Sequence, residues 1–263
     1  MNQLPANTGW LWVRQGYDFF KKQPLEFSTL FLGYLFFMLV IGSIPVLGQI
    51  LSFVFLPLFT IAFMQACKEI DQGTKAHPRL LLYGFQSPHM GRLLQLGVLY
   101  LIAAITSLGA SALIDDGIFV QIMTGQLELS AKNIANTNMV GAMFFALLVY
   151  IPALMAFWFA GPLIAWQGMP VVKAVFYSFF ATWRSAKVFL VYGLAWFTVG
   201  GVLPTLISIF IAAITGYANM IILIMMPFSM ILTIVLYCSF YPTYRSVFGQ
   251  PAATAPTASS TIS

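Results

Sequence analysis

The residues best suited to metal or acid–base chemistry lie in one stretch, residues 67–92 of a 263-residue chain. Its two histidines, His77 and His89, follow Glu69 and Asp71. A metal site built from a local motif needs ligands at tight spacing, as in H-E-x-x-H. The histidines are twelve residues apart and form no such pattern. We therefore expect exposed loop histidines, no metal site and no cofactor.

Other reactive side chains are few. Asp115 and Asp116 could bind a cation, although a polar helix end also accounts for them. Cys67 and Cys238 fall at the ends of apolar segments on the side predicted to be cytoplasmic, where thiols stay reduced, so we expect no disulfide. The chain has no nucleophile elbow, P-loop, dinucleotide fingerprint or zinc signature. We predict that it is not an enzyme and has no catalytic residues.

The elements that carry these residues follow from the composition. The chain is 60% hydrophobic and 7% charged, whereas a typical soluble domain is roughly 45–50% apolar and about 25% charged. Six stretches are long enough to span a bilayer core of about 30 Å; they lie near 27–44, 49–66, 93–114, 140–165, 188–212 and 220–241. All 19 charged residues lie outside them. We predict an all-α polytopic membrane helix bundle, with one domain at 1–249 and a disordered tail at 250–263.

Short amphipathic helices are predicted before the odd-numbered spans, near 9–22, 79–91 and 172–186. Aromatic residues on such helices favour the membrane interface. We interpret six of them as interfacial anchors: Trp10, Trp12, Phe20, Phe176, Phe180 and Trp183. The pattern also divides the chain into three units, 9–66, 79–165 and 172–241, which would be parallel repeats because each contains two spans.

The positive charges indicate the orientation. Six spans place both termini on one side of the membrane, and eleven of the twelve Lys and Arg residues fall on that side. Only Lys132 falls on the other. Because positive residues collect in cytoplasmic loops, we predict an inner-membrane protein with both termini in the cytoplasm.

Two groups of residues inside the spans could shape a site or an interface. Prolines inside a helix interrupt its backbone hydrogen bonds, so a kink or cavity is expected near each of them. The prolines of the spans are Pro57, Pro152, Pro162 and Pro227. Small residues recur at helical spacing and permit close helix packing, either inside the bundle or at a homodimer face; these are Ala103, Ser107, Ser111, Gly193 and Gly201.

No Asp, Glu, Lys, Arg or His falls within the six windows, which argues against a carrier coupled to protons or sodium. The polar residues that remain are predicted to form interhelical hydrogen bonds: Ser52, Thr60, Gln65, Thr106, Ser107, Ser111, Thr198, Ser208, Ser229 and Thr233.

Several short motifs resemble an uncharacterised bacterial family of predicted integral membrane proteins. They are P-A-N-T-G-W at 5–10, S-I-P-V-L-G at 43–48, F-L-P-L-F-T-I-A-F at 55–63, G-F at 84–85 and R-L-L-Q-L-G at 92–97. The resemblance covers most of the chain except the tail. It implies a six-span topology and supplies no catalytic residue.

Three functions are compatible with these features. The first is a non-enzymatic accessory or scaffold protein that assembles with itself or with other membrane proteins. The second is an uncoupled transporter or channel for a small or apolar solute, and the third is a lipid-interacting factor. A cavity between spans two, four and six would favour transport, whereas a dense bundle would favour assembly. The bilayer is the predicted partner, and no nucleic-acid motif occurs.

Overall fold

The computed structural model describes residues 4–45, 47–128, 137–215 and 217–250, and these residues form helices without a β-strand. Six helical segments are long and apolar enough to cross a membrane: Pro24–Gly42, Leu47–Asp71, Met90–Asp115, Met139–Gln167, Ala186–Ile214 and Asn219–Phe248. The predicted all-α bundle with six spans is therefore confirmed. The part of the predicted tail beyond Gln250 lies outside the described residues.

The spans form three helical hairpins. The first pairs α2 (Pro24–Gly42) with α3 (Leu47–Asp71), and the second pairs α5 (Met90–Asp115) with α8 (Met139–Phe157). In the third, α11 (Ala186–Phe197), the π-helix η2 (Thr198–Val202) and α12 (Leu203–Thr215) run against α13 (Ala218–Phe248). The short helix α6 (Ile118–Met123) follows α5.

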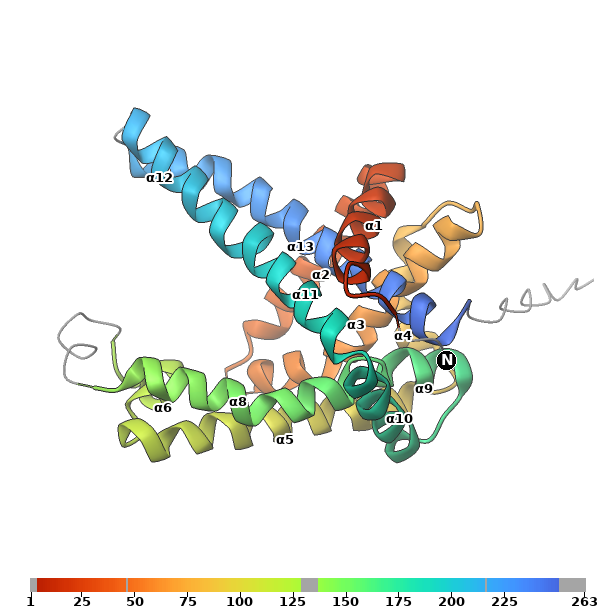
Figure 1. Ribbon diagram of the computed structural model, residues 1–263, viewed down its shortest axis with the longest axis horizontal. Helices are drawn as coiled ribbons and strands as arrows, with labels where there is room; N and C mark the ends of the chain where they lie inside the picture. Colours follow the sequence, from red (N-terminus) through yellow and green to blue (C-terminus); the bar gives the residue numbers. More distant parts are fainter. Residues whose placement is uncertain (1–3, 46, 129–136, 216, 251–263) are drawn as a thin grey trace, which may run out of the picture.

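The remaining helices gather at the end of the molecule where both described chain ends lie (Figure 1). They are α1 (Thr8–Lys22), the 3-10 helix η1 (Pro78–Leu82), α4 (Tyr83–Gln86), α9 (Ala160–Gln167) and α10 (Val171–Arg184). We call this end the base, and we call the second and third hairpins the arms. The arms diverge from the base, so that their far ends lie well apart (Figure 1). Each hairpin follows a helix of the base in the sequence; repetition of these units stays a prediction.

Helix α3 is the most enclosed span. It packs against α2, α5, α9 and α13, and 56% of its most apolar window is buried. The corresponding share for the span that contains α11 and α12 is 6%. The core therefore sits around α3 and the base, and most of each arm is left for contact with lipid.

Helix α1 is part of this core. Gly9 and Gly16 lie two turns apart on one face, where a Cβ would collide with the backbone of α11 and of α13 respectively. Trp12 lies between them, is 1% exposed and donates its indole N–H to Ser246 Oγ at 2.8 Å. Trp12 and Phe20 were predicted as interfacial anchors, but both are buried because α1 packs against two spans. Trp10, on the other face of α1, is 51% exposed.

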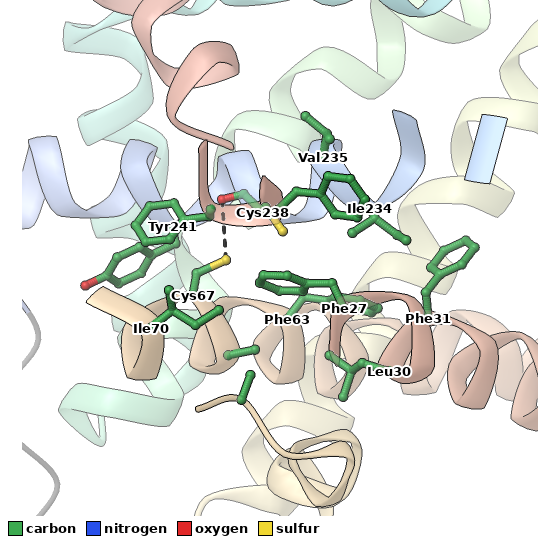
Figure 2. Packing of buried hydrophobic residues seen from close by; sticks show 14 residues of the cluster. Phe27, Leu30, Phe31, Phe63, Cys67, Ile70, Ile234, Val235, Cys238 and Tyr241 are labelled. Carbon is green, nitrogen blue, oxygen red and sulfur yellow. Dashed lines mark hydrogen bonds between the residues drawn. The ribbon is translucent and has the colours of Figure 1, made fainter. Parts of the chain in front are cut away.

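Figure 2 shows the hydrophobic core between α2, α3 and α13. Phe27 and Phe31 of α2 face Phe63 of α3 across this core. Cys67 and Cys238 are free, buried thiols within it, and Cys67 Sγ donates to the carbonyl oxygen of Cys238 at 3.7 Å. The thiols thus join α3 to α13 without a covalent bond.

Helices α3 and α13 continue past their predicted apolar windows because their polar ends find partners in the base. Asp71 accepts two hydrogen bonds from Arg245 at 2.8 Å and one from the Tyr241 hydroxyl at 3.0 Å. Lys68 is 1% exposed, and its Nζ lies 5.6 Å from the centre of the Trp166 ring. These contacts explain how charged residues remain helical beyond position 66.

The predicted small-residue positions fall into two groups. Ala103, Ser107 and Ser111 lie on α5, where Ser107 and Ser111 are buried and Ser107 Oγ donates to the Ala146 carbonyl of α8 at 2.5 Å. Gly193 instead faces open space, with nothing within 4 Å of a Cβ placed there, and the nearest atom to such a Cβ at Gly201 belongs to Phe197 of the same span. Close helix packing within this chain therefore occurs at the α5 stripe and not at Gly193.

Candidate intramembrane binding site

A cavity of about 250 Å³ lies where the arms meet α3. Four spans supply its walls: α3, α5, α8 with the residue that follows it, and α13. The lining side chains are Leu56, Thr60, Tyr100, Tyr150, Leu154, Phe157, Trp158, Thr233, Leu236, Tyr237 and Phe240. None of these described residues is charged. We call this space the aromatic cavity.

A break in span four shapes one wall of the cavity. Helix α8 ends at Phe157 and α9 begins at Ala160, so that two residues interrupt a span that would otherwise be continuous. Two side chains of α10 satisfy the freed backbone groups. Ser178 Oγ accepts from the Phe159 N–H at 2.8 Å and donates to the Met155 carbonyl at 3.0 Å, while Thr182 donates to the same carbonyl at 3.2 Å. The break thus directs Phe157 and Trp158 toward the cavity.

Aromatic contacts hold the lining side chains in place. Tyr100 stacks on Phe157 with ring centres 4.6 Å apart, and Trp158 meets Phe240 edge to face at 5.1 Å. On the α13 side, Tyr237 stacks on Phe63 at 4.6 Å. Because aromatic pairs of this kind are fixed in orientation as well as distance, the cavity has a preformed wall.

The hydroxyl groups of the cavity differ in what they offer to a ligand. Thr60 and Thr233 donate to carbonyls of their own helices at 2.9 and 2.8 Å, and Tyr100 donates to the Phe157 carbonyl at 3.3 Å. The Tyr150 hydroxyl forms no hydrogen bond to the described residues. It is therefore the group of this wall whose donor remains available to a bound molecule.

The prediction of interhelical hydrogen bonds is wrong for most intramembrane polar residues. Of the ten predicted residues, only Gln65 and Ser107 form a hydrogen bond with a described residue of another helix: Gln65 accepts from Trp166, and Ser107 donates to the Ala146 carbonyl. The others donate to carbonyls three or four residues earlier in their own helix, which are the nearest acceptors in an apolar environment: Ser52, Thr60, Thr106, Ser111, Thr198, Ser208, Ser229 and Thr233.

The predicted prolines lie near the cavity without lining it. Pro57 and Pro162 are buried, and Pro152 and Pro227 are exposed. Helices α3, α8 and α13 run through Pro57, Pro152 and Pro227 without a break, and only Pro162 lies close to one. The lining tyrosines and Trp158 were not predicted. The available signal was the presence of tyrosines within three separate spans.

The other candidate residues lie outside the cavity. Phe176, Phe180 and Trp183 are 61%, 47% and 63% exposed on α10, in the base. Asp115 accepts hydrogen bonds from the backbone N–H groups of Gly117 and Phe119, at the start of α6. Among the described residues, no group of three His, Cys, Asp or Glu side chains could hold a metal ion.

Comparison with known proteins gives one full-length relative. A probable inner membrane protein of Burkholderia thailandensis is 38% identical over 263 aligned positions, which cover 97% of this chain and 96% of that protein. No protein-family model matches the chain, and no solved structure matches it. The identity over nearly the full length, together with six spans, shows that the chain belongs to the same uncharacterised family of multi-pass bacterial inner-membrane proteins.

Proposed function

We propose that this inner-membrane protein is not an enzyme and that it binds an uncharged, largely apolar molecule taken directly from the bilayer. One observation carries the proposal: the aromatic cavity is bounded by α3, α5, α8 and α13. Of these helices, α5, α8 and α13 belong to the arms, which diverge from the base (Figure 1). A cavity among spans two, four and six favours solute binding and uncoupled transport over a purely structural role. The third function, a lipid-interacting factor, is included in this proposal, since the bilayer would supply the ligand.

The chemistry of the walls supports an uncharged ligand. An apolar molecule gains little by leaving lipid for an apolar cavity, because lipid tails are equally apolar. Selectivity must then come from shape and from hydrogen bonds. Stacked rings supply the shape, and the Tyr150 hydroxyl supplies a hydrogen-bond donor to any ligand that places an uncharged oxygen in the cavity. No lining side chain could couple binding to proton or sodium movement, because none of these residues is ionised at neutral pH.

We also propose that the base faces the cytoplasm, since eleven of the twelve Lys and Arg residues fall on the side of the termini. Cysteine labelling from outside whole cells tests this orientation. Gln126→Cys should label and Lys75→Cys should not, and the buried native Cys67 and Cys238 should stay silent. Labelling of Lys75→Cys without labelling of Gln126→Cys would show that the base faces outward and would contradict the proposed orientation.

An accessory role in an assembly is the second candidate, and Gly193 favours it. This glycine is exposed on α11, and nothing lies within 4 Å of its Cβ position, so a helix of another protein could approach closely there. Gly193→Leu should then lower the apparent mass of the detergent-solubilised complex. An unchanged mass would count against this candidate.

Photolabelling tests the binding proposal. The purified protein in nanodiscs is irradiated with an uncharged octyl alcohol that carries a terminal diazirine, and labelled peptides are identified by mass spectrometry. We expect labels on peptides that contain Tyr150 or Tyr237. Leu154→Trp should fill the cavity and remove the labels. Leu148→Trp, at a more exposed residue of the same helix that does not line the cavity, should retain them. Equal labelling of both variants would contradict the proposal.

A further inference from the structure

A second space lies within the third hairpin. It has a volume of about 550 Å³ and is bounded by α11, η2 and α12 on one side and by α13 on the other. Trp196, Gly200 and Pro204 line the first side. A π-helical turn is uncommon and is often found at functional sites; here η2 places Gly200 opposite α13, where the missing side chain leaves room.

This hairpin space and the aromatic cavity share two lining residues, Thr233 and Leu236 of α13. The α13 residues that line the two spaces include Met225, Ser229, Thr233, Leu236 and Phe240. Their spacing of four, four, three and four residues places them on one face of the helix. The two spaces therefore border the same stripe of α13, from the outer half of the arm to the base of the arms, and we call them together the groove.

The length of the groove follows from helix geometry. Fifteen residues separate Met225 from Phe240, so at about 1.5 Å per residue the stripe is roughly 22 Å long. One leaflet of the hydrocarbon core is about 15 Å deep, half of the roughly 30 Å of the whole core. The stripe is thus longer than one leaflet is deep, as expected for an extended chain and not for a compact solute.

The polarity of the groove excludes a headgroup from its interior. None of the described residues that line either space is charged. Ser208, Ser229 and Thr233 donate to carbonyls of their own helices, so their hydrogens are already used. The Tyr150 hydroxyl and the Trp196 indole N–H have no hydrogen-bond partner among the described residues. Two neutral donors do not replace the hydration that a phosphate or an ammonium group would lose there.

We propose that the groove along α13 holds one extended hydrocarbon chain of a membrane lipid, with the end of that chain in the aromatic cavity. The inference rests on the proposed function and goes further, because it fixes the ligand class as a long-chain lipid. A short chain would occupy the aromatic cavity alone. A long chain would also occupy the hairpin space, so its binding would depend on the room beside Gly200.

The test compares two uncharged alcohols, octyl and hexadecyl, each with a diazirine at the chain end, on the full-length protein in nanodiscs. Gly200→Leu fills the hairpin space, and Gly193→Leu is the matched control, since it adds the same side chain to the open face of the same span. Ser208→Leu fills the same space from α12 and serves if Gly200→Leu does not fold. Gel filtration identifies the folded variants.

We expect the hexadecyl probe to label peptides containing Tyr237 or Phe240, and Gly200→Leu or Ser208→Leu to lower this labelling by about tenfold. Labelling by the octyl probe, and all labelling of Gly193→Leu, should remain unchanged. If both probes label the cavity and neither filling variant affects the hexadecyl probe, the continuous groove is wrong while the proposed function stands. If neither probe labels the cavity of the wild-type protein, both proposals are wrong.

Discussion

The base and the arms are built from different interactions. In the base, side chains bond between helices: Trp12 with Ser246, Asp71 with Arg245, and Ser178 with the broken span four. In the arms, most Ser and Thr hydroxyls bond within their own helix, as Thr106 and Thr198 do. Interhelical bonds fix the base as one packed unit, whereas self-satisfied helices can separate in lipid without exposing an unpaired polar group. The difference explains how the arms diverge and how open space is left along α13.

The largest effect that separates the two regions should come from a pair of glycines. A Cβ at Gly97 of α5 would collide with the backbone of Val54 in α3, whereas one at Gly193 meets nothing. Overpacking usually costs about 1–3 kcal/mol, and a backbone cannot rotate away as a side chain can. We expect Gly97→Leu to lower the free energy of unfolding by more than about 3 kcal/mol and to yield little folded protein.

Fluorescence-detected size exclusion after heating measures this difference, with Gly193→Leu as the control. The control should retain the wild-type midpoint. Equal loss in both variants would mean that the arm is packed as tightly as the base.

The next effect concerns the break in span four. Ser178→Ala removes the acceptor of the Phe159 N–H, a buried donor, and one donor to the Met155 carbonyl. An unsatisfied buried group costs about 1–3 kcal/mol. The thermal midpoint should fall, and labelling of the aromatic cavity should fall with it because Trp158 is no longer held. Thr106→Val, which removes a bond within one exposed helix, should change neither; a matching loss there would remove the distinction between the regions.

A smaller effect is expected for the ion pair of the base. Asp71→Asn weakens the bonds to Arg245 and to the Tyr241 hydroxyl, and both partners are partly accessible to water. We expect a loss of about 1 kcal/mol, visible as a modest fall in thermal midpoint. Asp116→Asn removes the same charge from an exposed residue near the far end of an arm and should have no effect. An unchanged thermal midpoint in Asp71→Asn would show that the ion pair does not hold α13 to α3.

The number, order and approximate positions of the spans could be predicted, because a charge-free apolar window long enough to cross the bilayer is visible in the sequence. The role of α1 was misjudged for a physical reason. Its aromatic residues and cations resemble an interfacial helix, and only the seven-residue spacing of Gly9 and Gly16 indicates that two spans approach its backbone.

The candidate site was harder to predict than the topology. Prolines mark where a helix loses a hydrogen bond, but the cavity depends on which residues meet from four spans. Tyr100, Tyr150 and Tyr237 are separated by 50 and 87 positions and are brought together only by packing. Hydropathy does not encode which helices pack together. It also does not encode whether a hydroxyl group bonds to its own helix or to a neighbouring one.

Native mass spectrometry tests the central claim most directly, because it weighs whatever the protein retains from the membrane. We predict that the wild-type protein and Leu148→Trp carry a bound, uncharged long-chain lipid, and that Leu154→Trp has lost it. The claim is contradicted if the wild-type protein carries no such molecule, or if Leu154→Trp carries it to the same extent as Leu148→Trp.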